Sequence, residues 1–218
     1  MSKPYSSCTS YTNRTLAVAA RIALVMAVVP SVRTASAERF EVTAGAEGNL
    51  VTFESKAMME TFHGKTHRVS GYLELNPGAI GDSVAVFLEV DLATLDTGIG
   101  LRNRHMRENH LETDRYPLAV FRGAAILRGG GSALTAGASA RFFVAGTMEL
   151  HGVIRPLQIL VDVVLEGEDR RRLQVSTEFP ITLAEYEIER PKFIVLKLGE
   201  TQMVTVNLLA VSGAPERP

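Results

Sequence analysis

The stretch RFFVAGTMELHGVIRPLQILVDVVLE, residues 141–166, decides the fold. Apolar side chains alternate with other residues on both sides of the His151-Gly152 pair, and this period of two is typical of β-strands. The inward positions are Phe142, Val144, Gly146, Met148 and Leu150 before the pair, and Leu157, Ile159, Val161, Val163 and Leu165 after it. One apolar and one polar face predict an antiparallel hairpin with a single wet face.

The same alternation recurs along the chain, at residues 39–43, 50–55, 68–75, 84–90, 118–126, 173–181 and 204–208. The exceptions are a polar, basic segment near residues 99–112, expected to be a short helix, and a shorter helical turn expected at residues 57–62. A sheet of so many strands must close on itself to hide its apolar face and its edges. The sequence therefore predicts an all-β fold, an antiparallel barrel of about eight strands whose interior holds side chains or one ligand.

The first 37 residues have the layout of a secretory signal peptide. They contain no acidic residue, begin with basic residues, continue through an apolar run at 22–29 and end on Ala35-Ser36-Ala37. The apolar run is well short of the roughly 20 residues that span a bilayer, so a membrane anchor fits less well. We expect cleavage after Ala37, a periplasmic location, and a single domain over residues 38–218.

Composition narrows the function. Beyond residue 37 the chain keeps 19 basic and 24 acidic residues, a formal charge of −5, and no dense basic run, which argues against nucleic-acid binding. The one cysteine, Cys8, lies in the expected signal peptide, so no disulfide and no thiol nucleophile are expected in the mature protein.

The helix near residues 99–112 follows two glycines and carries a cluster of basic side chains: Arg102, Arg104, His105 and Arg107. Arginine forks and a helix N-terminus can hold a phosphate. A solvated basic helix paired with Glu108 and Glu112 explains the same pattern, and the residues alone leave both interpretations open.

The histidines of the chain suggest neither a metal site nor a catalytic one. His63 and His67 belong to a strand-like segment, and His105 and His110 are five residues apart, on different sides of a helix. No HExxH pattern, nucleophile elbow or paired carboxylates appear. We expect no metal, no cofactor and no enzymatic activity. The rival hypothesis is a hydrolase or other enzyme that uses His105 or His151 as a general base on a bound lipid.

The inward face of the barrel is the remaining candidate site. Periodicity cannot distinguish a solid core from a hollow one, but Gly71, Ala119, Gly123 and Gly146 are small inward residues that suggest a cavity. A filled structural barrel with a stress-related protein partner stays a second alternative.

Several spaced motifs carry a family resemblance. In chain order they are Phe53, Phe62-His63-Gly64, Leu95-Asp96-Thr97-Gly98, Arg102 through Met106, Tyr116-Pro117 with Phe121, and the run 146–156 with Leu150-His151-Gly152-Val153 and Arg155-Pro156. Over residues 40–210 the chain resembles the YceI-like family, often called polyisoprenoid-binding. Two positions depart from the family pattern, where an acidic residue is replaced by Asn103 and a glycine by Glu187.

The resemblance implies an extended lipocalin-like barrel that binds and sequesters or transports an isoprenoid or similar amphiphile, such as a quinone or a prenyl phosphate, without catalysis. Transient membrane contact for ligand exchange and a possible homodimer go with this expectation. The resemblance places Arg102, Arg104 and His105 near the pocket mouth. The expected lining is Phe53, Phe62, Leu73, Phe121, Phe142, Val144 and Met148.

Overall fold

The computed structural model describes residues 37–57, 60–80, 84–129, 133–167, 172–190 and 198–213. The expected signal peptide, apart from Ala37, lies outside the described residues. The strands are β1 Glu38–Val42, β2 Leu50–Ala57, β3 Thr61–Thr66, β4 Val69–Leu75, β5 Val84–Asp91, β6 Leu118–Gly129, β7 Ser139–Leu150, β8 Val153–Glu166, β9 Arg172–Thr182 and β10 Leu198–Ser212. Short helical segments are η1 Leu92–Thr94, α1 Gly100–His105, the π-helical turn η2 Met106–His110 and η3 Leu183–Tyr186.

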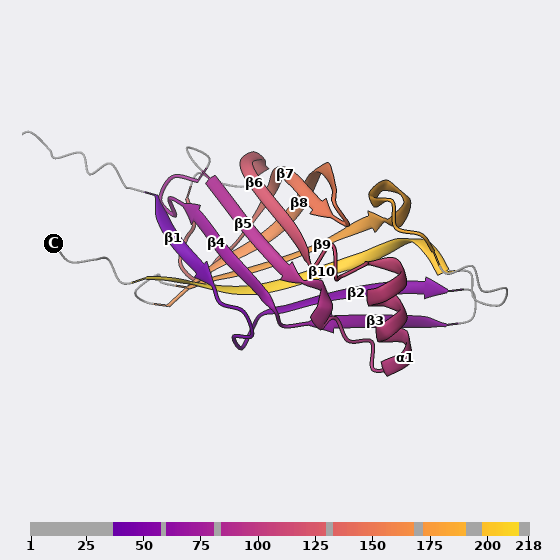
Figure 1. The fold of residues 1–218 in the computed structure, drawn as a ribbon. Helices are drawn as coiled ribbons and strands as arrows, with labels where there is room; N and C mark the ends of the chain where they lie inside the picture. Colours follow the sequence, from indigo (N-terminus) through magenta and orange to yellow (C-terminus); the bar gives the residue numbers. More distant parts are fainter. Residues whose placement is uncertain are drawn as a thin grey trace, which may run out of the picture. The chain divides into compact units, whose positions relative to one another are not determined.

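All named strands pair antiparallel, in the order β1-β4-β5-β6-β7-β8-β9-β10-β2-β3. The ring closes where β1 pairs with β10, with Phe40 opposite Ser212. Both β1 and β2 pair with β10, while β4 pairs with β1 and β3 with β2. The first four segments are therefore two long interrupted strands, and the predicted closed barrel of about eight strands is confirmed (Figure 1).

The buried side chain of Asn49 stabilises the loop between β1 and β2. The side-chain amide of Asn49 donates to Thr43 O at 2.9 Å, and its Oδ1 accepts from Leu209 N at 2.8 Å. The break in the ladder therefore leaves these backbone groups satisfied.

Two local expectations had different outcomes. The helix near residues 99–112 is confirmed as α1 and η2, which lie beside the β2–β3 hairpin (Figure 1). The helical turn at residues 57–62 is wrong, because Ala57 ends β2 while Thr61 and Phe62 begin β3. In the described part of the chain, no helix is long and apolar enough to span a membrane.

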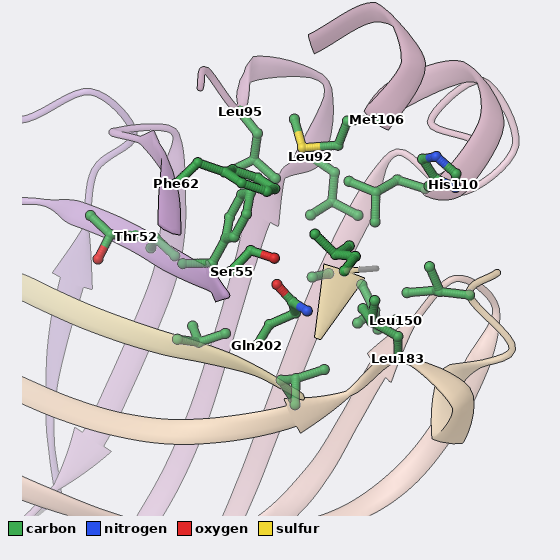
Figure 2. Close-up of a pocket in the computed structure, with 18 of the residues that line it drawn as sticks. Thr52, Ser55, Phe62, Leu92, Leu95, Met106, His110, Leu150, Leu183 and Gln202 are labelled. Atoms are coloured by element: carbon green, nitrogen blue, oxygen red, sulfur yellow. The ribbon is translucent and has the colours of Figure 1, made fainter. Parts of the chain in front are cut away.

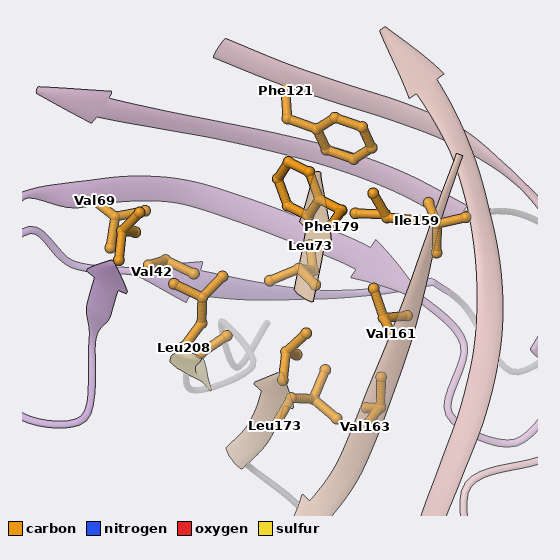
Figure 3. Packing of buried hydrophobic residues seen from close by; sticks show 14 of the residues in the cluster. Val42, Val69, Leu73, Phe121, Ile159, Val161, Val163, Leu173, Phe179 and Leu208 are labelled. Carbon is orange, nitrogen blue, oxygen red and sulfur yellow. The ribbon is translucent and has the colours of Figure 1, made fainter. Parts of the chain in front are cut away.

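Several side chains are fully buried at the end of the barrel away from α1. Phe40, Leu165, Leu173 and Ala210 have no exposed surface, and Leu208 is 2% exposed. Figure 3 shows Leu208 and Leu173 within the apolar cluster that continues through Leu73 to Phe121 and Phe179. Among the described residues, the larger cavity lies at the other end of the barrel, beside α1.

The inward glycines do not make that space. A Cβ on Gly71, whose φ is +138°, would lie 2.0 Å from the carbonyl oxygen of Phe87, and one on Gly146 would lie 2.3 Å from that of Arg122. These glycines let neighbouring strands approach closely. Of the four small residues that suggested a cavity, only Ala119 borders one.

Candidate functional site

A cavity of about 470 Å³ occupies the end of the barrel beside α1. We call it the outer chamber. The β2–β3 hairpin, the α1–η2 segment and the ends of β7, β9 and β10 surround it, and its walls are mainly aliphatic and aromatic (Figure 2). This volume falls in the range of small-molecule sites, which run from about 300 to 1,000 Å³.

A second, smaller cavity of about 110 Å³ lies deeper in the barrel, and we call it the inner chamber. Five residues line both chambers: Val90, Ala119, Met148, Phe179 and Val206. We call these five the neck. The chambers thus adjoin along the barrel, with the neck between them.

The loop at residues 95–99 and the start of α1 form the mouth of the outer chamber, and hydrogen bonds of Asn103 fix the conformation of this loop. Asn103 is 9% exposed, and its Oδ1 accepts from the backbone N and the Oγ1 of Thr97 at 2.8 and 2.6 Å. Its Nδ2 donates to Asp96 Oδ1 at 2.7 Å. An asparagine can both accept and donate here, which a carboxylate could not do, so this departure from the family pattern leaves an ordered mouth.

Asp96 connects this loop to the hairpin. Its backbone exchanges two hydrogen bonds of 2.9 Å with Lys65 of β3. Hydrogen bonds from Gly98 N and from Asn103 favour the ionised carboxylate and hold the pKa of Asp96 below its usual range. The mouth is therefore tied to the edge of the sheet by backbone bonds.

Arg102 is engaged within the mouth. Its Nε donates to Thr97 Oγ1 at 2.9 Å and its Nη2 to Thr97 O at 2.8 Å. Its Nη1 lies 3.2 Å from Glu60 Oε1, and its guanidinium stacks 4.4 Å from the centre of the Phe62 ring. The charge of Arg102 is therefore already paired with Glu60, and its contacts stabilise the mouth.

Ser55, Gln202 and His110 contribute polar groups to the mainly apolar wall of the outer chamber. Ser55 of β2 and Gln202 of β10 are directly opposite each other in the ladder and face inward. His110 of η2 hydrogen-bonds Glu189 O through Nδ1 at 2.8 Å, and burial holds the pKa of His110 below its ordinary value. His110 therefore faces the chamber as an uncharged ring near neutral pH.

The structure brings nine of the ten sequence-predicted site residues to the two chambers. Phe53, Phe62, Arg102, His105 and Met148 line the outer chamber; Leu73, Phe121, Phe142, Val144 and Met148 line the inner one. Arg104 lines neither and is exposed. Sequence reasoning missed Ser55 and Gln202, although each is a polar residue at an inward position of an alternating strand.

His151 lies outside both chambers. Its backbone has a φ of 53°, and Nδ1 bonds Tyr186 O at 3.1 Å. Within the described ranges its buried Nε2 has no hydrogen-bond partner, and Glu112 Oε1 lies 3.5 Å from it, too far for a good hydrogen bond. No cluster of three or more His, Cys, Asp or Glu side chains able to hold a metal occurs among the described residues.

Glu187, the second departure from the family pattern, ends η3 with a φ of 56°. It occupies the left-handed conformation that a glycine adopts without strain. The turn thus forms without the glycine, and its backbone N donates to Ala184 O at 3.2 Å.

Comparisons with known proteins agree with this architecture. The solved polyisoprenoid binding domain from Saccharophagus degradans matches with a TM-score of 0.66 at 20% identity, covering 81% of this chain and 99% of that domain. BcnA of Burkholderia cenocepacia matches with a TM-score of 0.62 at 18% identity, covering 75% of this chain and 96% of BcnA. Among proteins with curated descriptions, none is significantly similar in sequence.

The family models give the assignment. A YceI-like domain matches residues 40–210, the segment that forms the barrel, both chambers and the mouth. The chain belongs to the YceI-like domain family.

Proposed function

We propose that this protein is a non-catalytic carrier that binds the apolar chain of a polyisoprenoid-type lipid in the two chambers. The observation that carries the proposal is the pair of adjoining apolar cavities, about 470 and 110 Å³, inside the barrel. Its similarity in fold to a polyisoprenoid binding domain supports the proposal.

The energetics suit exchange with a membrane. Burying a long hydrocarbon chain gains about 0.8 kcal/mol per carbon relative to water, so a chain of about forty carbons would exceed any observed affinity. Relative to a bilayer, where the chain is already in an apolar phase, this gain nearly cancels. The head group then determines which lipid is preferred.

Two exposed apolar side chains at the mouth support a contact with a membrane. Ile99 and Leu101 are 51% and 60% exposed, yet both border the outer chamber. Exposed apolar residues that continue into a pocket mark an interaction surface. We propose that this lip contacts the bilayer during lipid exchange, in the periplasm, after cleavage of the expected signal peptide at Ala37.

Native mass spectrometry of the protein purified from its own periplasm tests the proposal. We expect an added mass that matches an isoprenoid lipid. N-terminal sequencing of the same material is expected to start at Glu38. Protein that carries no lipid after expression with its own membranes, and that also takes up no prenol from vesicles, would contradict the carrier function.

The lip has its own test. Replacing Ile99 and Leu101 by serine should slow the transfer of a fluorescent prenol from vesicles without changing its affinity in detergent. Ile154→Ser is the matched control, because Ile154 is 59% exposed but borders neither chamber. Equal slowing by the control would remove any special role of the lip.

A further inference from the structure

Two polar side chains, Ser55 and Gln202, lie next to each other in the wall of the outer chamber, and we call this pair the polar point. A row of inward residues crosses four neighbouring strands: Ile181 of β9, Gln202 of β10, Ser55 of β2 and Phe62 of β3 are opposite one another in turn. Directly opposite residues share a face of a sheet. Figure 2 shows the Ser55 hydroxyl and the Gln202 amide together, pointing into the chamber.

Ser55 has an unused hydrogen-bonding group. The residue is 0% exposed, and its Oγ has no hydrogen-bond partner in the described part of the chain. A buried hydroxyl without a partner costs about 1 to 3 kcal/mol, so most such groups in folded proteins are satisfied. An apolar residue at this position would avoid that cost.

Gln202 presents its oxygen to the chamber. The residue is 7% exposed, and Nε2 donates to Gly199 O at 2.8 Å. Because a carbonyl oxygen can only accept, this bond fixes which end of the amide faces Gly199. Among the described residues nothing donates to Gln202 Oε1. The polar point therefore offers one hydroxyl and one acceptor oxygen.

We propose that Ser55 and Gln202 recognise the hydroxyl group of a long-chain prenol. The ligand oxygen accepts from Ser55 Oγ, and the ligand hydroxyl donates to Gln202 Oε1. This inference rests on the proposed lipid-binding function and specifies the head group that the pocket takes.

A phosphate fits this point poorly. The acceptor oxygen of Gln202 repels an anion, and an unpaired charge in an apolar pocket costs far more than a hydroxyl does. The arginine nearest to the chamber, Arg102, already has all three guanidinium nitrogens in contact with Thr97 and Glu60. The prenol is thus distinguished from its own phosphate ester by the same two residues.

Fluorescence displacement with three probes of equal chain length tests the proposal: geranylgeraniol, its methyl ether and geranylgeranyl phosphate. We expect the alcohol to bind roughly three- to tenfold more tightly than either of the others, the usual value of one hydrogen bond. In Gln202→Met the affinity for the alcohol should fall to that for the ether. Ser55→Ala should weaken the alcohol by a similar factor.

Ser70→Ala is the matched control. Ser70 lies on β4, its hydroxyl donates to Glu89 Oε1 at 3.2 Å, and it borders neither chamber, so affinity should not change. Thermal unfolding provides a second measurement. Because Ser55 Oγ lacks a partner, Ser55→Ala should leave the melting temperature of the ligand-free protein unchanged or higher, whereas a structural role would lower it.

The inference is wrong, while the carrier function stands, if geranylgeranyl phosphate binds more tightly than the other two probes. It is also wrong if both Ser55→Ala and Gln202→Met bind geranylgeraniol as tightly as the unmodified protein does. Failure of all three probes to bind the unmodified protein would instead overturn the carrier function, and this inference with it.

Discussion

Ala119→Phe should separate the two chambers. Ala119 lies in the neck and lines both cavities, so a phenyl ring at this position projects between them. A lipid whose tail passes the neck would lose the inner chamber, whereas a lipid confined to the outer chamber would not.

The size of the loss follows from the inner chamber. Its volume is about 110 Å³, and unfilled apolar cavity costs about 24 cal/mol per Å³, which gives about 2.6 kcal/mol. The dissociation constant of a long prenol should therefore rise by up to roughly 80-fold. A short prenol should keep its affinity.

The assay is displacement of a fluorescent lipid by a prenol series from geraniol to solanesol. Ala85→Phe is the matched control, since Ala85 lies on the adjacent strand β5 and borders neither chamber. The reasoning is refuted if Ala119→Phe weakens short and long prenols equally, or weakens neither. The first result would mean general damage to the pocket, and the second that tails do not reach the inner chamber.

Three further perturbations have defined outcomes. Burial lowers the pKa of His110 from 6.5, so the unfolded chain takes up a proton at a higher pH than the folded one. The free energy of unfolding, measured by urea denaturation, should therefore fall as the pH is lowered through about 6.5. In His110→Gln this dependence of the free energy of unfolding on pH should be weaker. Val144→Asp places a carboxylate in the inner chamber and should cost about 3 to 5 kcal/mol of stability at pH 7, with recovery at low pH. Arg102→Ala removes the bonds to Thr97 and the pair with Glu60 and should cost about 1 to 3 kcal/mol by the same assay, while Arg104→Ala should stay within about 0.5 kcal/mol.

Strand positions and the inward face could be predicted from alternation alone. Phe142, Val144 and Met148 lie on one face because successive strand residues point to opposite sides, and closure follows from the need to bury that face. The short helix near residues 99–112 also followed from its polar composition.

The interior could not be predicted in the same way. Gly71 and Gly146 are inward glycines, yet they accommodate a neighbouring backbone, while the cavity depends on how side chains from distant strands meet. Arg102 and Arg104 look equivalent in sequence. Only the fold brings Glu60 and Phe62 to one of them and leaves the other exposed.

The barrel closes where β1 and β10, the first and last named strands along the chain, pair with each other, with Phe40 opposite Ser212. Strand β10 pairs with β1, β2 and β9. Three strands therefore lack a pairing partner until this one segment, near the end of the described chain, has folded. Contacts between such distant parts of a chain form slowly, because the entropy of closing a long loop is lost before any pairing is gained. Until β10 is in place, the β1–β4 and β9 edges stay open to pairing with other chains. A chain shortened within β10 should therefore aggregate through these edges and should not settle into a smaller barrel.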